Sequence, residues 1–266
     1  MRRDRGRVRA PLALLPPAAL AVGLVALPLA ALLQRTPWTG LGELLGEPVV
    51  ADALRLSLVT ASLATVVSVL LGVPLAWVLA RVEFPGRSVL RAVVTLPMVL
   101  PPVVGGAALL FALGRRGLVG RPLEDATGIL LPFSTAGVVL ANTFVAMPFL
   151  VITVEAALRS VDRRYEDAAA TLGAGRLRVF RRVTVPLVAP SVLAGAVLCW
   201  ARALGEFGAT VTFAGNLQGR TQTMPLAVFL ALESDRDAAI ALSLVLVAVS
   251  LVVLVGLRDR WLPATS

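Results

Sequence analysis

The sequence predicts an all-α integral membrane protein with six transmembrane helices. Hydrophobic residues make up 58% of the 266-residue chain and charged residues only 15%, so the chain carries more apolar surface than one soluble domain could bury. Between the charges lie six long uncharged runs, each near the roughly 20 residues with which a helix crosses the hydrocarbon. The runs cover residues 10–34, 56–80, 92–114, 126–154, 183–201 and 238–257.

Arginine sets the predicted orientation, because all 25 basic residues are Arg. With the N-terminus in the cytoplasm, the cytoplasmic segments hold seventeen of the 25, as the positive-inside rule requires. We therefore expect both termini in the cytoplasm, and topology rather than nucleic-acid binding explains the net charge of +9. The predicted organisation is a basic N-terminus 1–9, a transmembrane domain 10–257 that includes a cytoplasmic loop 158–186, and a cytoplasmic tail 258–266.

The first run admits two interpretations. Five arginines before an apolar stretch are typical of a secretory signal, but this stretch is longer than the roughly 7 to 15 residues of a signal's apolar region. We interpret the run as helix 1, made irregular by Pro16, Pro17 and Pro28. Trimming of the N-terminal segment stays open.

Missing residue types exclude several chemistries. The chain has no His and one Cys, Cys199, so disulfides, histidine metal sites and thiolate clusters are not expected. Without Lys there is no Gly-x-x-x-x-Gly-Lys phosphate loop. We therefore predict no catalytic residue, no metal site and no cofactor bound by this chain, and any ATP-driven work would belong to a separate subunit.

The third run, between a tight cytoplasmic turn at 81–87 and an outer loop at 114–132, contains helix-breaking residues. Pro97, Pro101 and Pro102 remove backbone donors, and Gly105 permits a bend or a close approach. A broken helix at membrane depth is expected to line a cavity, because against lipid its freed backbone groups would stay unsatisfied. A kink that serves only packing is the alternative.

The cytoplasmic loop 158–186 has its own pattern. Residues 165–172 should form a short helix with Asp162 as its N-cap and Glu166 and Asp167 in its first turns, and Gly173 should end it. An arginine-rich segment and Pro186 follow. This helix–turn–helix is suited to docking a partner, although an ordinary basic loop that only sets topology would have similar residues.

The end of the fifth run carries two charges. Arg202 and Glu206 are four residues apart, so they share a helix face and can pair. The pair is either structural or part of a gate in which arginine holds positive potential over an oxyanion path. Beyond it, neutral donors such as Thr210 and Asn216 can hold an oxyanion loosely or simply form a polar outer loop. Segment 224–232 is too short to span, so it should lie at the interface or cap the channel.

Residues 167–186 resemble the cytoplasmic signature of the membrane subunits of bacterial ABC importers: Glu-Ala-Ala, three residues, Gly, nine residues, Ile, one residue, Leu-Pro. The spacing of glycine and proline agrees, and Asp replaces Glu while Val replaces both Ile and Leu. The cytoplasmic loop 158–186, which contains this signature, is hereafter called the coupling loop. The resemblance implies that its helix sits in a groove of an ATPase subunit. The implied coupling residues are Glu166, Asp167, Ala168, Ala169, Gly173 and Pro186.

Segments 95–106, 201–216 and 220–227 resemble the molybdate permease subunits, with the sulfate permeases as near relatives. The resemblance implies a type I ABC importer permease that carries molybdate or tungstate through the bacterial inner membrane. A sulfate or thiosulfate permease is the alternative within this class. The implied pathway or gate residues are Pro97, Pro101, Pro102, Gly105, Arg202, Gly205, Glu206, Gly208, Thr210 and Asn216.

The same resemblance implies the partners. They are two ABC ATPase subunits that use ATP, a soluble substrate-binding protein, a second copy of this chain and membrane lipid, with no nucleic acid. A stand-alone channel or an ion-coupled carrier is the alternative from another class, and it would need no ATPase.

Overall fold

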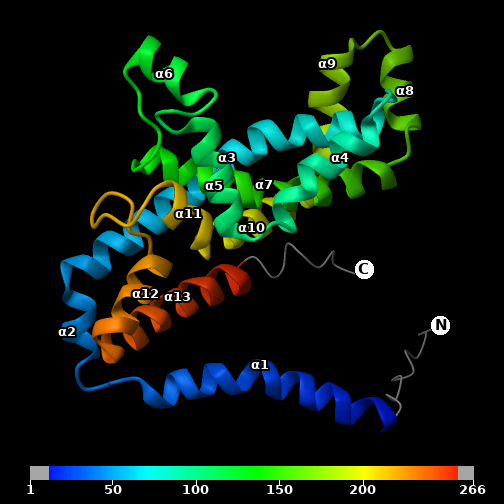
Figure 1. Ribbon diagram of the computed structural model, residues 1–266. Helices are drawn as coiled ribbons and strands as arrows, with labels where there is room; N and C mark the ends of the chain where they lie inside the picture. Colours follow the sequence, from blue (N-terminus) through cyan, green and yellow to red (C-terminus); the bar gives the residue numbers. More distant parts are fainter. Residues whose placement is uncertain (1–11, 257–266) are drawn as a thin grey trace.

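The computed structural model describes residues 12–256, and this part of the chain folds into helices with no strand (Figure 1). The predicted basic N-terminus 1–9 and tail 258–266 lie outside the described residues, as do the outermost residues of the first and last predicted runs. Five helices are long and apolar enough to cross a membrane, and a bent pair of helices supplies a sixth crossing if it is counted as one span. The all-α membrane fold is therefore confirmed, but one of its six segments is not a straight helix.

The five long helices are joined by shorter ones. The long helices are α1 (Leu15–Arg35, entered through the 3-10 turn Leu12–Leu14), α3 (Pro48–Arg81), α7 (Thr135–Ser160), α10 (Val185–Leu204) and α13 (Arg236–Gly256). The bent pair consists of α4 (Arg87–Thr95), continued by the 3-10 turn Leu96–Met98, and α5 (Pro102–Leu113). The short helices are α2 (Leu41–Gly46), α6 (Gly120–Thr127), α8 (Arg164–Thr171), α9 (Arg176–Val179), α11 (Gly208–Phe213) and α12 (Met224–Ser234), and the π-helical turn η3 covers Phe180–Thr184.

The predicted starts of two membrane helices, α3 and α7, were wrong. Helix α3 begins at Pro48, ahead of the predicted residue 56, and it includes Asp52 and Arg55 because a helix can continue past the hydrocarbon. Helix α7 begins only at Thr135, where the Ser134 hydroxyl caps it by accepting the Gly137 N–H at 3.0 Å. The predicted run before Ser134 contains the end of α6, an irregular stretch at 128–131 and a turn at 132–133, so hydropathy alone placed this start too early.

The bend in the third segment is sharp. The axes of the 87–98 and 102–113 halves differ by 115°, so the prediction of one helix over 92–114 was wrong in shape. Pro101 and Pro102 are two successive residues without a backbone N–H, so the helix of the first half cannot continue through them. Pro102 is the first residue of α5, where the backbone N–H would have no partner within the helix and its absence costs nothing. The predicted break is therefore confirmed, and it is a true reversal rather than a mild kink.

Helices α3, α7 and α10 form the centre of the bundle. Alanines of α3, among them Ala61, Ala64 and Ala76, are fully buried against Leu150 and Val154 of α7. Helix α10 approaches α7 so closely that a Cβ on Gly195 would lie 3.2 Å from Thr153 Cβ and 3.3 Å from Leu150 Cα. Small residues at these contacts let the helix backbones pack in lipid, where apolar burial alone gives no driving force.

Helix α1 lies apart from this centre (Figure 1). None of its residues is buried, and it contacts the rest of the chain through α13. The predicted helix 1 is confirmed as a helix. Pro28 does not interrupt it, since the helix continues through that residue. Helix α12 is confirmed as a short apolar helix, and it packs against α13 and α3.

The close α7–α10 contact generates a prediction. Replacing Gly195 with Val should destabilise the protein by about 1–3 kcal/mol, because the added carbons must displace the α7 backbone. The matched change Gly23→Val in α1 should cost almost nothing, since a Cβ on Gly23 would meet no atom within 4 Å. Unfolding of the purified chain in detergent measures both, and equal losses would contradict the tight α7–α10 contact.

Candidate functional site

The coupling loop (158–186) folds as a helix, a glycine turn and a second helix. Helix α8 begins at Arg164, whose N–H donates to Asp162 Oδ1 at 3.0 Å, so Asp162 caps the first turn although Arg163 holds the cap position. Gly173 ends the helix with a φ of +80°, a conformation that glycine adopts without strain. The predicted helix–turn–helix is confirmed, with the second helix passing into α10 through the π-helical turn η3.

Glu166 ties the coupling loop to the bundle. Its Oε2 lies 3.4 Å from Arg81 Nε at the end of α3, and its Oε1 accepts the Thr184 hydroxyl at 2.8 Å. Arg81 also donates from Nη2 to the Val161 carbonyl at 3.2 Å. One carboxylate thus links α8, the end of α3 and the entry to α10. The sequence pattern did not reveal Arg81 and Thr184 as its partners, because contacts this far apart in the chain leave no local signal.

The outer surface of α8 is open. Asp167 and Ala168 are exposed, Ala169 is half-buried, and Leu172 at the end of the helix is 88% exposed. No ion pair of Asp167 occurs among residues 12–256. The two adjacent acids therefore have different roles: Glu166 faces the protein and Asp167 faces outward, beside small and apolar residues that another protein can approach closely.

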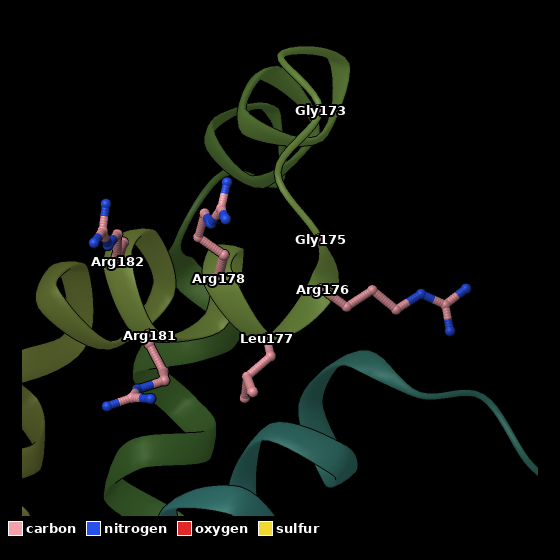
Figure 2. Close-up of a pocket in the computed structure, with 7 residues that line it drawn as sticks. All are labelled: Gly173, Gly175, Arg176, Leu177, Arg178, Arg181 and Arg182. Atoms are coloured by element: carbon pink, nitrogen blue, oxygen red, sulfur yellow. The ribbon is translucent and has the colours of Figure 1, made fainter.

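Four arginines follow the glycine turn and line a cavity of about 780 Å³ with Gly173, Gly175 and Leu177. Figure 2 shows Arg178 and Arg182 pointing to one side of this segment, Leu177 and Arg181 to the opposite side, and Arg176 away from both. The guanidinium groups diverge rather than converge on one point. They form a basic surface on α9 and η3, and Pro186, the second residue of α10, is exposed.

Two of the predicted pathway residues, Pro102 and Gly208, meet where α5 and α11 cross. A Cβ on Gly208 would lie 2.8 Å from Pro102 Cβ, and one on Gly106 would lie 2.8 Å from the Ala209 carbonyl oxygen. Gly105 faces α7, where a Cβ on it would lie 3.1 Å from Phe144 Cε1. The structure thus brings Pro102 and Gly208, which are far apart in the sequence, into contact through a backbone approach that only glycine permits.

Not all predicted pathway residues join this crossing. Pro97 and Pro101 lie in the bend before α5, where Val99 is 83% exposed, and Gly205 is exposed at the end of α10. The bend is therefore on an open face of the single chain. The coupling residues form a separate group at the Arg81 end of α3, so the two predicted sites occupy different parts of the bundle (Figure 1).

Arg202 and Glu206 form an ion pair, with Arg202 Nη2 2.6 Å from Glu206 Oε2. The Glu206 side chain is 1% exposed, and its Oε1 also accepts the Ala209 N–H at 2.7 Å. Glu206 lies just past the end of α10, so it caps α11 while it neutralises Arg202. The predicted pair is present and has a structural role; participation in a gate stays a prediction.

Some of the polar side chains after Glu206 already form hydrogen bonds within the chain. The Thr210 hydroxyl donates to Asn142 Oδ1 of α7 at 3.3 Å, and both residues are buried. The Thr221 hydroxyl accepts the Leu217 N–H at 2.8 Å and so supports a turn. Asn216 Oδ1 is buried without a hydrogen-bond partner among the described residues. Sequence reasoning missed Asn142, because one amide in an apolar helix is not marked by any motif.

Comparison with known proteins places these features in context. The family pattern described as "Binding-protein-dependent transport system inner membrane component" matches residues 72–263. The molybdenum transport system permease protein ModB of Mycobacterium tuberculosis is 53% identical over 246 residues, which are 92% of each chain. The sulfate transport system permease protein CysT of Escherichia coli is 36% identical over 236 residues, 87% of this chain and 85% of that protein.

A solved structure has a similar fold. It is the crystal structure of a bacterial ABC transporter involved in the import of the acidic polysaccharide alginate, and the match has a TM-score of 0.77 over 96% of this chain and 95% of that chain. At 18% sequence identity, this likeness concerns the fold alone.

The Arg202–Glu206 pair generates a prediction. Glu206→Gln should lower stability by about 3 kcal/mol, because it leaves the Arg202 charge without its buried partner. Adding Arg202→Gln should recover part of that loss, since the unpaired charge is then gone. Unfolding of the two single variants and the double variant in detergent gives the coupling free energy, and purely additive losses would contradict a structural pair.

The two acids of α8 give a second prediction. Glu166→Ala should release the coupling loop from Arg81 and Thr184, so trypsin should cut after Arg176 or Arg178 several times faster than in the unchanged protein. Asp167→Ala, the neighbouring loss of one carboxylate, should leave the cutting rate unchanged because Asp167 has no such contacts. Equal acceleration in both variants would disprove the role assigned to Glu166.

Proposed function

The chain belongs to the family of binding-protein-dependent transport system inner membrane components, and from this premise we propose that it forms the translocation pathway of an ATP-driven importer for molybdate or tungstate. As a member of that family it is a multi-pass membrane subunit of a transporter and not an enzyme. The observation that carries the proposal is the coupling loop, whose glycine-ended helix presents Asp167 and Ala168 outward while Glu166 anchors it to α3 and α10.

We propose that a separate ATPase subunit docks on the exposed face of α8. Small side chains at Ala168 and Ala169 permit close contact, and the Gly173 turn sets how far the helix projects. Because Glu166 holds both Arg81 and Thr184, a push on α8 would reach the ends of α3 and α10 together. ATP would be used by that partner, and this chain would bind no cofactor itself.

We propose that the oxyanion passes along the face formed by α5 and α11. The negative charge of Glu206 offsets most of the positive potential of Arg202, so a divalent anion would meet a weak positive potential and neutral donors and would not be trapped. The exposed bend at Pro101 offers an open face for a second copy of the chain, and two copies with two ATPases and a soluble binding protein would complete the importer. The predominance of arginine in the predicted inner segments supports cytoplasmic termini.

We propose molybdate rather than sulfate as the substrate because the chain is more similar in sequence to a molybdenum permease than to a sulfate permease. Identity is 53% to a molybdenum permease and 36% to a sulfate permease over similar lengths. A sulfate or thiosulfate permease is the second candidate, favoured by that same 36% relationship. A channel or ion-coupled carrier would leave the outward-facing helix α8 without a use.

Transport by the reconstituted system tests the proposal. The chain should be placed in vesicles with its ATPase and binding-protein partners, and uptake of labelled molybdate measured with and without ATP and with a large excess of sulfate. We expect uptake that needs ATP and resists sulfate. Loss of uptake in sulfate would move the assignment to the sulfate permeases, and uptake without ATP would rule out the importer.

Two variants test the coupling role in the same assay. Asp167→Ala and Gly173→Val should each reduce ATP-dependent uptake at least about tenfold and weaken co-purification of the ATPase, because they alter the docking face and its turn. Asp125→Ala removes a carboxylate that is also exposed, at α6, and should change neither. Unchanged co-purification in all three variants would contradict docking at α8.

A further inference from the structure

We propose that the chain binds a phosphate-type oxyanion in an arginine-lined cavity formed by the beginning of α4, the end of α7 and the segment that joins α7 to α8. The cavity has a volume of about 570 Å³, and its lining includes Arg87, Ser88, Arg91, Arg159 and Arg163. It lies at the end of the bundle that bears the coupling loop, and neither the coupling residues nor the pathway residues line it.

The cavity carries more positive than negative charge. Of its four guanidinium groups, those of Arg91 and Arg159 share one carboxylate, since the Nη2 atom of each lies 2.7 Å from Glu155 Oε1. Glu155 is largely buried behind them, and the sequence neighbours Glu83 and Asp162 do not line the cavity. No ion pair of Arg163 occurs among residues 12–256. One carboxylate cannot neutralise four cations, so the cavity attracts anions.

Three of the four arginines, Arg87, Arg91 and Arg159, are held in place before any anion arrives. Arg87 donates from Nε to the Leu79 carbonyl at 2.7 Å and from Nη2 to the Ala80 carbonyl at 3.3 Å. Each guanidinium has five N–H donors, so these contacts leave others unused. The side chains of Arg91 and Arg159 remain 34% and 48% exposed. An anion would therefore meet fixed, accessible donors and lose little binding free energy in ordering them.

The chemistry of these donors selects the ligand class. Planar guanidinium groups bind the oxygens of phosphate and related oxyanions in pairs, which a spherical halide cannot match. The start of α4 adds positive potential, because no side chain caps it. On α4 itself, Val89 and Val93 are exposed on the side of the helix away from Arg87 and Arg91. Two sources of the same chemistry fit: the headgroup phosphate of an anionic lipid whose chain follows α4, or a free oxyanion.

Two measurements on the full chain separate these sources. Native mass spectrometry of the purified protein counts bound phosphatidylglycerol against phosphatidylcholine, and the unfolding midpoint in detergent is compared in inorganic phosphate and in chloride of equal ionic strength. Arg163→Gln should weaken the binding about tenfold, because it removes a guanidinium that has no internal partner. Ser88→Glu should abolish it, and a carboxylate in the first turn of α4 favours rather than harms that helix.

The control is Arg182→Gln, which removes one exposed arginine from the coupling loop and should leave binding unchanged. Selective retention of phosphatidylglycerol that is lost in both cavity variants would assign a lipid headgroup to the site. Stabilisation by phosphate that is lost in both would assign a free oxyanion. If neither arm responds to Arg163→Gln and Ser88→Glu, or if Arg182→Gln has the same effect, the proposed site is wrong.

Discussion

Close approach between helix backbones is the constraint on which this structure depends. In a lipid environment apolar side chains gain nothing by leaving the solvent, so helices associate through van der Waals packing at small residues. The buried alanines of α3 and Gly195 of α10 let both helices pack against α7. Gly106 and Gly208 do the same where α5 crosses α11. Both the coupling loop and the candidate pathway are attached to this one packed centre.

Three buried or half-buried carboxylates fix the positions of the charged segments. Glu155, Glu166 and Glu206 each contact arginine, and each joins segments that packing alone would leave loose. Glu166 joins α8 to α3 and to the start of α10, Glu206 holds the turn from α10 into α11, and Glu155 joins α4 to the end of α7. Because a buried charge is costly unless it is paired, these contacts set positions more than they add stability. Asp167, which has no such contact, is the acid left available to a partner.

Those features of the fold and of the candidate sites that depend on residues close together in the chain could be predicted from the sequence. Long uncharged runs indicated the membrane helices, Gly173 indicated the end of α8, and the four-residue spacing indicated the Arg202–Glu206 pair. The prolines at 101 and 102 indicated a break, but the 115° reversal depends on what α5 packs against, which is α11 far along the chain. The start of α7 was missed because a turn can be as apolar as a helix.

The sequence by itself determined the class of protein, the approximate membrane segments and the coupling loop, because hydropathy, glycine and proline act within a few residues. Only the tertiary structure decided that Glu166 faces inward and Asp167 outward, and that Asn142 meets Thr210. It also decided that two arginines of α4, one at the end of α7 and one between α7 and α8 line one cavity. Those relations join residues many positions apart. They arise when helices pack against one another, and local patterns in the sequence do not show which helix faces come into contact.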